Sequence, residues 1–480
     1  MGQEVKSANF SEEDFILFKD KLRKETSILK NWFENDNFVS EELTCGLELE
    51  AWLVDKDYSA LAENQNFLSK IQSDLVDSEL AKFNIELNTV PRKAKANMLS
   101  AFHSDLTNLW QSCTQSAAEL EAKLLMIGIL PTLRDEQLNM SQVSPMQRYL
   151  ALNEQVLNLR EGKPLLIDIK KKDELNLSHD DVMLEAAATS LQIHLQVPPA
   201  KAKRYYNASL IASALTVAAG ANSPYLFGNE LWEETRIPLF EQAVSVASFR
   251  DKKGRNVGRV TFGTDYEHKS LLGLFLENLD GYPILLPDVS NSLPEKLANL
   301  RLHNGCIWRW NRPIIGVHSS LDSLPNLRIE HRVISAGPTL SDITANIALY
   351  LGLSHYLANL ELAPEELLSF EQVRENFYSS AKDGLDAEIK WLDGEIYNID
   401  KLLLGKLLPA AREALLELEI DSEDIDRYFD QILVERVISK RNGSAWQKAF
   451  IEKNGQDFKA MTSAYHSMQE EDLPVHKWSL

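Results

Sequence analysis

The sequence predicts an α+β fold, in which a curved antiparallel sheet is flanked by helices and followed by a mostly helical C-terminal part. Several short segments alternate apolar and polar side chains, which is the period of a strand that buries one face. Elsewhere apolar residues recur at helical spacing, and helical patterns dominate from residue 341 onward. We therefore place a boundary near residue 340, between a sheet-bearing part (1–340) and a helical part (341–480) packed on it.

Composition narrows the class of protein. The 480 residues are 44% hydrophobic and 25% charged, which is ordinary for a globular chain with a large core. The formal net charge of -21 disfavours nucleic acid and anionic membranes as partners, and we expect neither. Three widely spaced cysteines without a CxxC pair favour a reducing compartment. Because the first 20 residues lack the pattern of a signal peptide, we expect a cytoplasmic protein.

The first helix is predicted over residues 11–35. Ser11 stands before three acidic residues, as helix N-caps often do, and Phe18, Leu22 and Leu29 follow at near-helical spacing. We expect this helix to pack its apolar face on the rest of the domain and to expose its basic residues to solvent.

The first strand is predicted over residues 46–55, with Glu48 and Glu50 on one face. The other face is apolar and consists of Leu47, Leu49, Ala51 and Leu53. Two carboxylates roughly 7 Å apart on one strand face repel each other unless water, a cation or a basic group compensates them. Two interpretations follow: the solvated outer face of a half-buried sheet, or a metal-binding strand.

Three later segments, residues 83–90, 191–197 and 327–333, repeat this alternation. Their polar faces consist of Glu86 and Asn88, of Gln192, His194 and Gln196, and of Arg328, Glu330 and Arg332, respectively. Between the strands we expect helices near residues 99–109 and 204–221, an apolar strand over 124–130, and a polar, loop-rich stretch over 132–180.

The four polar faces share one composition. They carry carboxylates, amides, an imidazole and guanidinium groups but no lysine, whereas a merely solvated face would mix in Lys, Thr and Ser. Mg²⁺ takes oxygen ligands, and arginine forks bind phosphate oxygens bidentately. Brought together in one curved sheet, these faces would form a bowl that binds metal and nucleotide phosphate, which we prefer to the solvated face. No GxxxxGK[ST], HExxH, GxSxG or strand-linked GxGxxG motif indicates other chemistry.

Four motifs on these strands form an ordered set. They are Gly46-Leu-Glu-Leu-Glu50, Ile85-Glu-Leu-Asn-Thr-Val-Pro91, Gln192-Ile-His-Leu-Gln196 and Arg328-Ile-Glu-His-Arg332. The set resembles the signature strands of the bacterial glutamate–cysteine ligase family and its carboxylate–amine ligase relatives, from about residue 44 to residue 345. The resemblance implies the glutamine synthetase fold, an antiparallel sheet funnel, with residues 1–340 as the catalytic domain.

The resemblance also implies cofactors and roles: an enzyme that uses ATP and Mg²⁺, with Mn²⁺ as the alternative ion. The implied metal ligands are Glu48, Glu50, Glu79, Glu86, Glu330 and His194, and the implied cofactor-binding residues are Gln192, His194, Arg328 and Arg332. Arg332 would stabilise the transferred phosphoryl group, and Arg236 would act near the substrate carboxylate or phosphate. For Arg236, a surface ion pair in the run Glu233-Glu-Thr-Arg236 is the alternative.

The implied reaction joins the γ-carboxylate of glutamate to an amine through an acyl phosphate. Cysteine is the first expectation for the amine, and a different amine or acid is the second. A non-catalytic nucleotide or metal sensor with the same fold and a metal-dependent amide hydrolase stay open as other functions. We expect small-molecule partners, namely glutamate, an amine and ATP, and a homo-oligomer stays open.

Overall fold

The centre of the fold is an antiparallel sheet of eight strands, seen in a computed structural model that describes residues 4–39, 42–246, 249–251, 253–318 and 323–480. Six strands follow the order β15–β16–β8–β1–β3–β2, and β4 and β5 pair with β1. Their bounds are β1 Thr44–Val54, β2 Val76–Ser78, β3 Asn84–Asn88, β4 Arg92–Lys93, β5 Lys123–Leu125, β8 Ser190–Gln196, β15 Asn311–Gly316 and β16 Asn326–Ser335.

The four predicted alternating strands are confirmed as β1, β3, β8 and β16, and they are neighbours in this sheet. The register aligns their polar positions, because Glu50 lies opposite Glu86 on β3, and His194 of β8 lies opposite Glu330 of β16. Directly opposed residues of antiparallel strands point to the same face. Polar side chains far apart in the sequence therefore share one face of the sheet.

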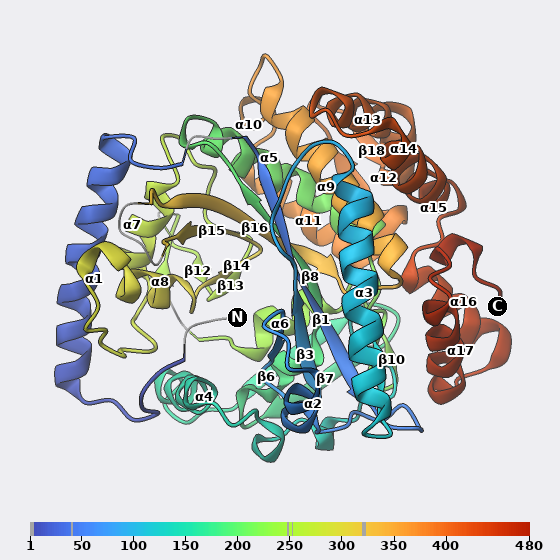
Figure 1. The fold of residues 1–480 in the computed structure, drawn as a ribbon, viewed down its shortest axis with the longest axis horizontal. Coiled ribbons are helices and arrows are strands. Elements are labelled where there is room, and N and C mark those ends of the chain that lie inside the picture. The colour runs from blue at the N-terminus through green and yellow to red at the C-terminus, as the bar shows by residue number, and fades with distance from the viewer. Residues whose placement is uncertain (1–3, 40–41, 247–248, 252, 319–322) are drawn as a thin grey trace.

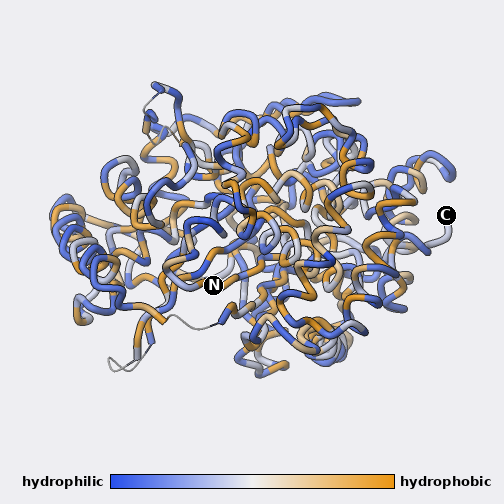
Figure 2. The backbone as a smooth tube through the Cα atoms, turned by 90° about the horizontal axis from the view of Figure 1, so that it is seen from above, coloured by the Kyte–Doolittle hydropathy of each residue, from blue (hydrophilic) through white to orange (hydrophobic). Residues whose placement is uncertain are grey.

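Helices bury the apolar face of the sheet. The helix α5 (Pro199–Ala219) packs on β16 and on α9 (Leu340–Asn359), while α3 (Met98–Ala118) contacts α9 and α11 (Phe370–Asp383) contacts α5. Both α5 and α9 are buried over most of their length, as expected for helices that are apolar or small on nearly every side. In Figure 2 hydrophobic segments gather in the middle of the molecule and hydrophilic ones lie mainly at its periphery.

A second set of helices lies on the polar side of the sheet. Figure 1 shows α1 (Glu12–Glu34), α7 (Leu272–Gly281) and α8 (Ala298–Asn304) across the sheet from α5 and α9, with α4 (Gln147–Leu159) and α6 (Arg236–Ala243) below. The predicted first helix is confirmed, and Ser11 caps it through a reciprocal pair with Asp14. Glu25 of α1 accepts hydrogen bonds from the Asn299 side chain and the Leu300 backbone, which ties α1 to α8.

The chain beyond residue 340 is mostly helical, as predicted, with one hairpin of β17 (Glu388–Lys390) and β18 (Ile396–Asn398) as the exception. Its other helices are α10 Pro364–Leu367, α12 Ile399–Leu402, α13 Leu408–Glu417, α14 Ser422–Asp424, α15 Glu435–Ser439, α16 Gly443–Asn454 and α17 Phe458–Glu470, with π-helical turns at Leu403–Leu407 and Ile425–Val434. One hydrophobic core contains residues from both sides of residue 340.

The prediction of a loop-rich stretch over residues 132–180 is wrong. This stretch contains α4 and a hairpin of β6 (Leu165–Lys170) and β7 (Glu174–His179). Tyr149, Leu152 and Val156 of α4 are buried at helical spacing, and alternate residues of β6 are buried. The apolar strand predicted over 124–130 is also shorter, because β5 ends at Leu125. The smaller elements are α2 Asn64–Ile71, β9 Tyr225–Leu226, β10 Asn229–Glu230, β11 Phe249–Arg250, β12 Asn256–Val257, β13 Val260–Thr261 and β14 Trp308–Arg309.

Candidate active site

A pocket of about 260 Å³ opens on the polar face of the sheet. All the residues for which the family resemblance implied a role line it, and these are Glu48, Glu50, Glu79, Glu86, Gln192, His194, Arg236, Arg328, Glu330 and Arg332. The solvated-face interpretation is therefore wrong, since Glu86 and Glu330 expose only 2% and 1% of their surface. The structure brings the predicted residues together, whereas their individual roles stay predictions.

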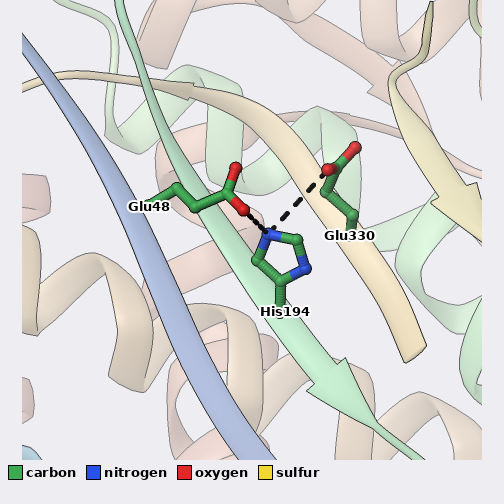
Figure 3. Close-up of side chains that lie close together, drawn as sticks. All are labelled: Glu48, His194 and Glu330. Atoms are coloured by element: carbon green, nitrogen blue, oxygen red, sulfur yellow. Dashed lines mark ion pairs between the residues drawn. The ribbon is translucent and has the colours of Figure 1, made fainter. Parts of the chain in front are cut away.

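The first acidic group of the pocket consists of Glu48, His194 and Glu330, shown in Figure 3. Three neighbouring strands, β1, β8 and β16, each contribute one member. The His194 Nε2 atom lies 3.0 Å from a Glu48 oxygen and 3.8 Å from a Glu330 oxygen. One ligand atom of each residue lies within 4.8 Å of the others, close enough to hold one cation.

Basic neighbours keep this first group ionised. Arg312 of β15 lies opposite Glu330 and donates two hydrogen bonds to its two carboxylate oxygens, of 2.7 and 2.8 Å. Burial alone would raise the pKa of Glu330, but the charges of Arg312, Arg332 and His194 outweigh it and lower the pKa. The pKa of Glu48 is likewise lowered, because His194 outweighs the effect of burial.

The second acidic group consists of Glu50, Glu79 and Glu86, whose ligand atoms also lie within 4.8 Å of one another. Glu50 comes from β1, two residues after Glu48, and Glu86 comes from β3 directly opposite it. Glu79 follows the short strand β2, where its own backbone oxygen accepts a hydrogen bond from Ser144. Alternate residues of β1 thus contribute one member to each of the two acidic groups.

The charges of this second group are poorly compensated. Burial raises the pKa of Glu50 to about 7, with Glu86 adding to the rise and Arg332 opposing it. Burial and the charges of Glu86 and Glu50 raise the pKa of Glu79 well above its usual value, and burial also raises the pKa of Glu86. Three buried carboxylates that resist ionisation together are a setting that a divalent cation would stabilise.

Gln192 contacts the second acidic group. Its side chain donates a 2.9 Å hydrogen bond to Glu50, and the Ser190 backbone donates a second bond of 2.6 Å to the other oxygen. These two contacts fix the orientation of the Glu50 carboxylate within the pocket.

The arginines of the pocket differ in how many of their nitrogen atoms contact other protein groups. Arg236 is 2% exposed, pairs with Glu234 at 3.3 Å and donates to the backbone oxygen of Val333, so the surface ion pair considered for it is wrong. Arg332 lies over the Phe240 ring. Within the described residues, one terminal nitrogen of Arg332 and the Nε atom of Arg328 are buried without a hydrogen-bond partner.

Several pocket residues were missed from the sequence, namely Arg148, Tyr149, Glu185, Arg301 and Arg312. For Arg312 a signal existed, because it begins the short apolar run Arg312-Pro-Ile-Ile-Gly-Val317 that precedes the strand carrying Glu330. The helical spacing of Tyr149, Leu152 and Val156 was the corresponding signal for α4. Glu185 stands within the apolar run Val182-Met-Leu-Glu-Ala-Ala-Ala188, which indicates burial but does not by itself indicate a role.

The fold and the site define an α+β protein whose antiparallel sheet carries acidic and basic side chains into one pocket. A family model fixes the class further, since the glutamate-cysteine ligase family 2 (GCS2) matches residues 44–453, and the chain belongs to this family. It is accordingly an ATP-dependent carboxylate–amine ligase, an enzyme that forms a C–N bond. No curated protein matches the chain in a sequence comparison.

Three solved structures are similar to the chain at low identity. The glutamate–cysteine ligase from Francisella tularensis in complex with AMP shares 10% identity at a TM-score of 0.49, over 92% of this chain and 96% of that one. A bifunctional glutathione synthetase from Pasteurella multocida shares 12% at 0.46, over 93% and 55%. The ligase PafA in complex with the ubiquitin-like protein Pup shares 12% at 0.38, over 90% and 73%.

Among the described residues, no helix is both long enough and apolar enough to cross a membrane.

Proposed function

We propose that this enzyme joins the γ-carboxylate of glutamate to an amine, with cysteine as the first candidate, and that the reaction proceeds through an acyl phosphate. The observation that carries the proposal is the pair of acidic groups that meet at β1, which contributes Glu48 to one and Glu50 to the other, in one pocket with arginines. Such a site suits the transfer of a phosphoryl group between two anionic substrates, because cations must offset the charge of both.

The residues present fit Mg²⁺ or Mn²⁺ in both acidic groups. The second group offers carboxylate oxygens alone, the ligands that hard cations prefer, and the raised pKa values show that its charges lack compensation. The first group adds the imidazole of His194, which suits Mn²⁺ as well as Mg²⁺. Bound metal would neutralise the charge on the ATP phosphates and on the reacting carboxylate.

Three arginines have different proposed roles around the phosphates of ATP. Arg312 already donates two hydrogen bonds to Glu330, so we assign it to holding that ligand in its ionised form. Arg328 and Arg332 each keep a buried nitrogen that has no hydrogen-bond partner in the described part of the chain, and we assign these nitrogens to phosphate oxygens of ATP, with His194 beside them. Arg332 then stabilises the phosphoryl group during transfer.

The chemistry follows from this arrangement. A carboxylate is a poor electrophile, so an oxygen of the glutamate side chain attacks the terminal phosphorus of ATP, and ADP leaves. The site holds both reactants in place and supplies positive charge, so the reaction needs no covalent protein nucleophile. Arg236, held by Glu234, directs its guanidinium toward the reacting carboxyl or phosphoryl group. The amine then displaces phosphate.

We extend the proposal to the architecture. The antiparallel sheet with its polar pocket supports a funnel of the glutamine synthetase type, in which ATP and glutamate enter from opposite sides and the metals lie between them. Residues 1–340 would form the catalytic domain, and residues 341–480 a helical part that packs on it through α9.

The test is ADP release by the purified protein with ATP and Mg²⁺, first with glutamate alone and then with a panel of amines including cysteine. We expect release that depends on glutamate together with one amine, and a matching γ-glutamyl product by mass spectrometry. Replacing Mg²⁺ by Mn²⁺ should preserve activity, and a chelator should abolish it. Measurable ATP binding without ADP release for any pair would contradict the proposal and favour a sensor or a different acid.

A further inference from the structure

One side of the pocket is formed by Glu185, Arg148 and Tyr149, to which no role has been given so far. Glu185 lies in a short 3-10 helix, Val182–Ala187, just before β8, and the other two residues begin α4. The two elements are joined, because the Val182 backbone donates a 3.1 Å hydrogen bond to the Asn153 side chain of α4. This connection fixes the position of Glu185 relative to Arg148 and Tyr149.

Glu185 is a carboxylate at the pocket wall with an unused acceptor. Its Oε2 atom is buried and, within the described part of the chain, has no hydrogen-bond partner. Leaving a buried acceptor unsatisfied is costly, so such a group in a pocket wall indicates a ligand that donates to it. Burial raises the pKa of Glu185 to about 7, although Arg332 and Arg148 oppose the rise.

Glu185 shares the pocket with residues that we assign to the reacting centre. The charges that act on it come from Arg332, Arg148 and Glu50. Under the proposed function, Arg332 contacts the transferred phosphoryl group, and Glu50 belongs to the second acidic group. Glu185 therefore lines the same pocket as these groups, within the space that the acyl phosphate and a second substrate would share.

We propose that Glu185 forms the subsite for the amine: its carboxylate binds the incoming ammonium group and takes the proton that this group must lose before it attacks. The inference rests on the proposed function and deepens it, since it makes the second substrate a cationic primary amine. Tyr149, which is 6% exposed, and Phe240, over whose ring Arg332 lies, line the same pocket and would exclude water from this subsite.

The ammonium nitrogen gives one proton to the Glu185 carboxylate, and its freed electron pair forms a bond to the carbonyl carbon of the acyl phosphate. The bond between that carbon and the phosphate oxygen breaks, and phosphate leaves with the electron pair. A second proton passes from nitrogen to the departing phosphate, and Glu185 later returns its proton to water.

The test separates the two half-reactions in Glu185→Gln, which keeps the shape of the side chain and removes its charge. Acyl-phosphate formation is followed without amine by positional isotope exchange in labelled ATP with glutamate and Mg²⁺. Amine transfer is followed with cysteine, and also with hydroxylamine, a nucleophile that is uncharged at neutral pH and needs no base. Glu154→Gln is the matched control, because Glu154 lies on α4 but outside the pocket lining.

We expect Glu185→Gln to lose at least about 100-fold in kcat/KM for cysteine, the typical contribution of a general base, while isotope exchange and hydroxamate formation stay close to the unaltered protein. Glu185→Asp should recover part of the loss, and Glu154→Gln should change neither half-reaction.

Two results would overturn the inference: full activity of Glu185→Gln with cysteine, or a loss of isotope exchange as large as the loss of amine transfer. If the unaltered protein itself shows no isotope exchange, the proposed function fails first and takes the inference with it.

Discussion

At the scale of single residues, Glu330 has the most connected position in the pocket. It lies opposite His194 on the neighbouring strand, and its two carboxylate oxygens accept hydrogen bonds from the guanidinium of Arg312. Glu330→Gln would keep the size of the side chain but remove the charge that a cation and His194 require. We expect ATP turnover to fall by at least about 100-fold, since charge stabilisation supplies most of the rate in such sites.

The measurement for Glu330 is ADP release with glutamate and the active amine. Glu174→Gln on the exposed face of β7 is the control, and it should retain full turnover. Turnover of Glu330→Gln equal to that of the control would remove Glu330 from the metal ligands.

Single residues also show which parts of the candidate site could be predicted from the sequence. Glu48, Glu86, His194 and Glu330 were predictable because each lies on a strand whose alternation is unbroken. Arg312 was not assigned a role, because a local pattern can predict its strand but not the partner of that strand, and its importance comes from cross-strand pairing with Glu330. The same holds for Glu185, whose surroundings come from α4 and β16.

At the scale of elements, a carboxylate of β1 repels one of β3, and a bound cation would relieve this repulsion. Glu50 on β1 and Glu86 on β3 oppose each other directly in a buried part of the sheet. Glu86→Gln removes one charge, so we expect the metal-free protein to gain about 1 kcal/mol of unfolding free energy. The same variant should lose most of the thermal stabilisation that Mg²⁺ or Mn²⁺ gives the unaltered protein.

Calorimetry with and without metal measures both effects of Glu86→Gln. Glu119→Gln, an exposed glutamate just after α3, is the control and should respond to metal as the unaltered protein does. An unchanged metal response in Glu86→Gln would contradict a metal site at the second acidic group.

At the scale of the whole molecule, the sequence predicted the central sheet because hydrophobic alternation is a property of each strand by itself. The order of the strands in the sheet could not be predicted in this way, because the connections between β3, β8 and β16 are dozens of residues long and no strand records its neighbour. The helix α4 was missed because its apolar residues, which recur at helical spacing, lie within a long stretch that is rich in polar residues. The boundary at residue 340 stays a prediction.

Acid stability of the whole molecule depends on buried neutral histidines. His303 of α8 is buried, and its Nε2 atom contacts the Asn278 backbone oxygen at 2.9 Å. Burial lowers the pKa of His303 to about 4 from its usual 6.5. Between these two values the unfolded chain binds a proton that the folded protein does not, so stability falls as pH drops through this window and is fully present above it.

Lowering the pH from 7 to 5 should therefore cost the protein about 2 kcal/mol through His303 alone. Glu50, Glu79 and Glu86 act in the opposite direction, since their raised pKa values favour the folded state on acidification. We expect His303→Gln to lose about 2 kcal/mol less than the unaltered protein between these pH values, measured by urea unfolding. His268→Gln, at an exposed histidine, should show the full loss, and an equal loss in His303→Gln would exclude His303 as its source.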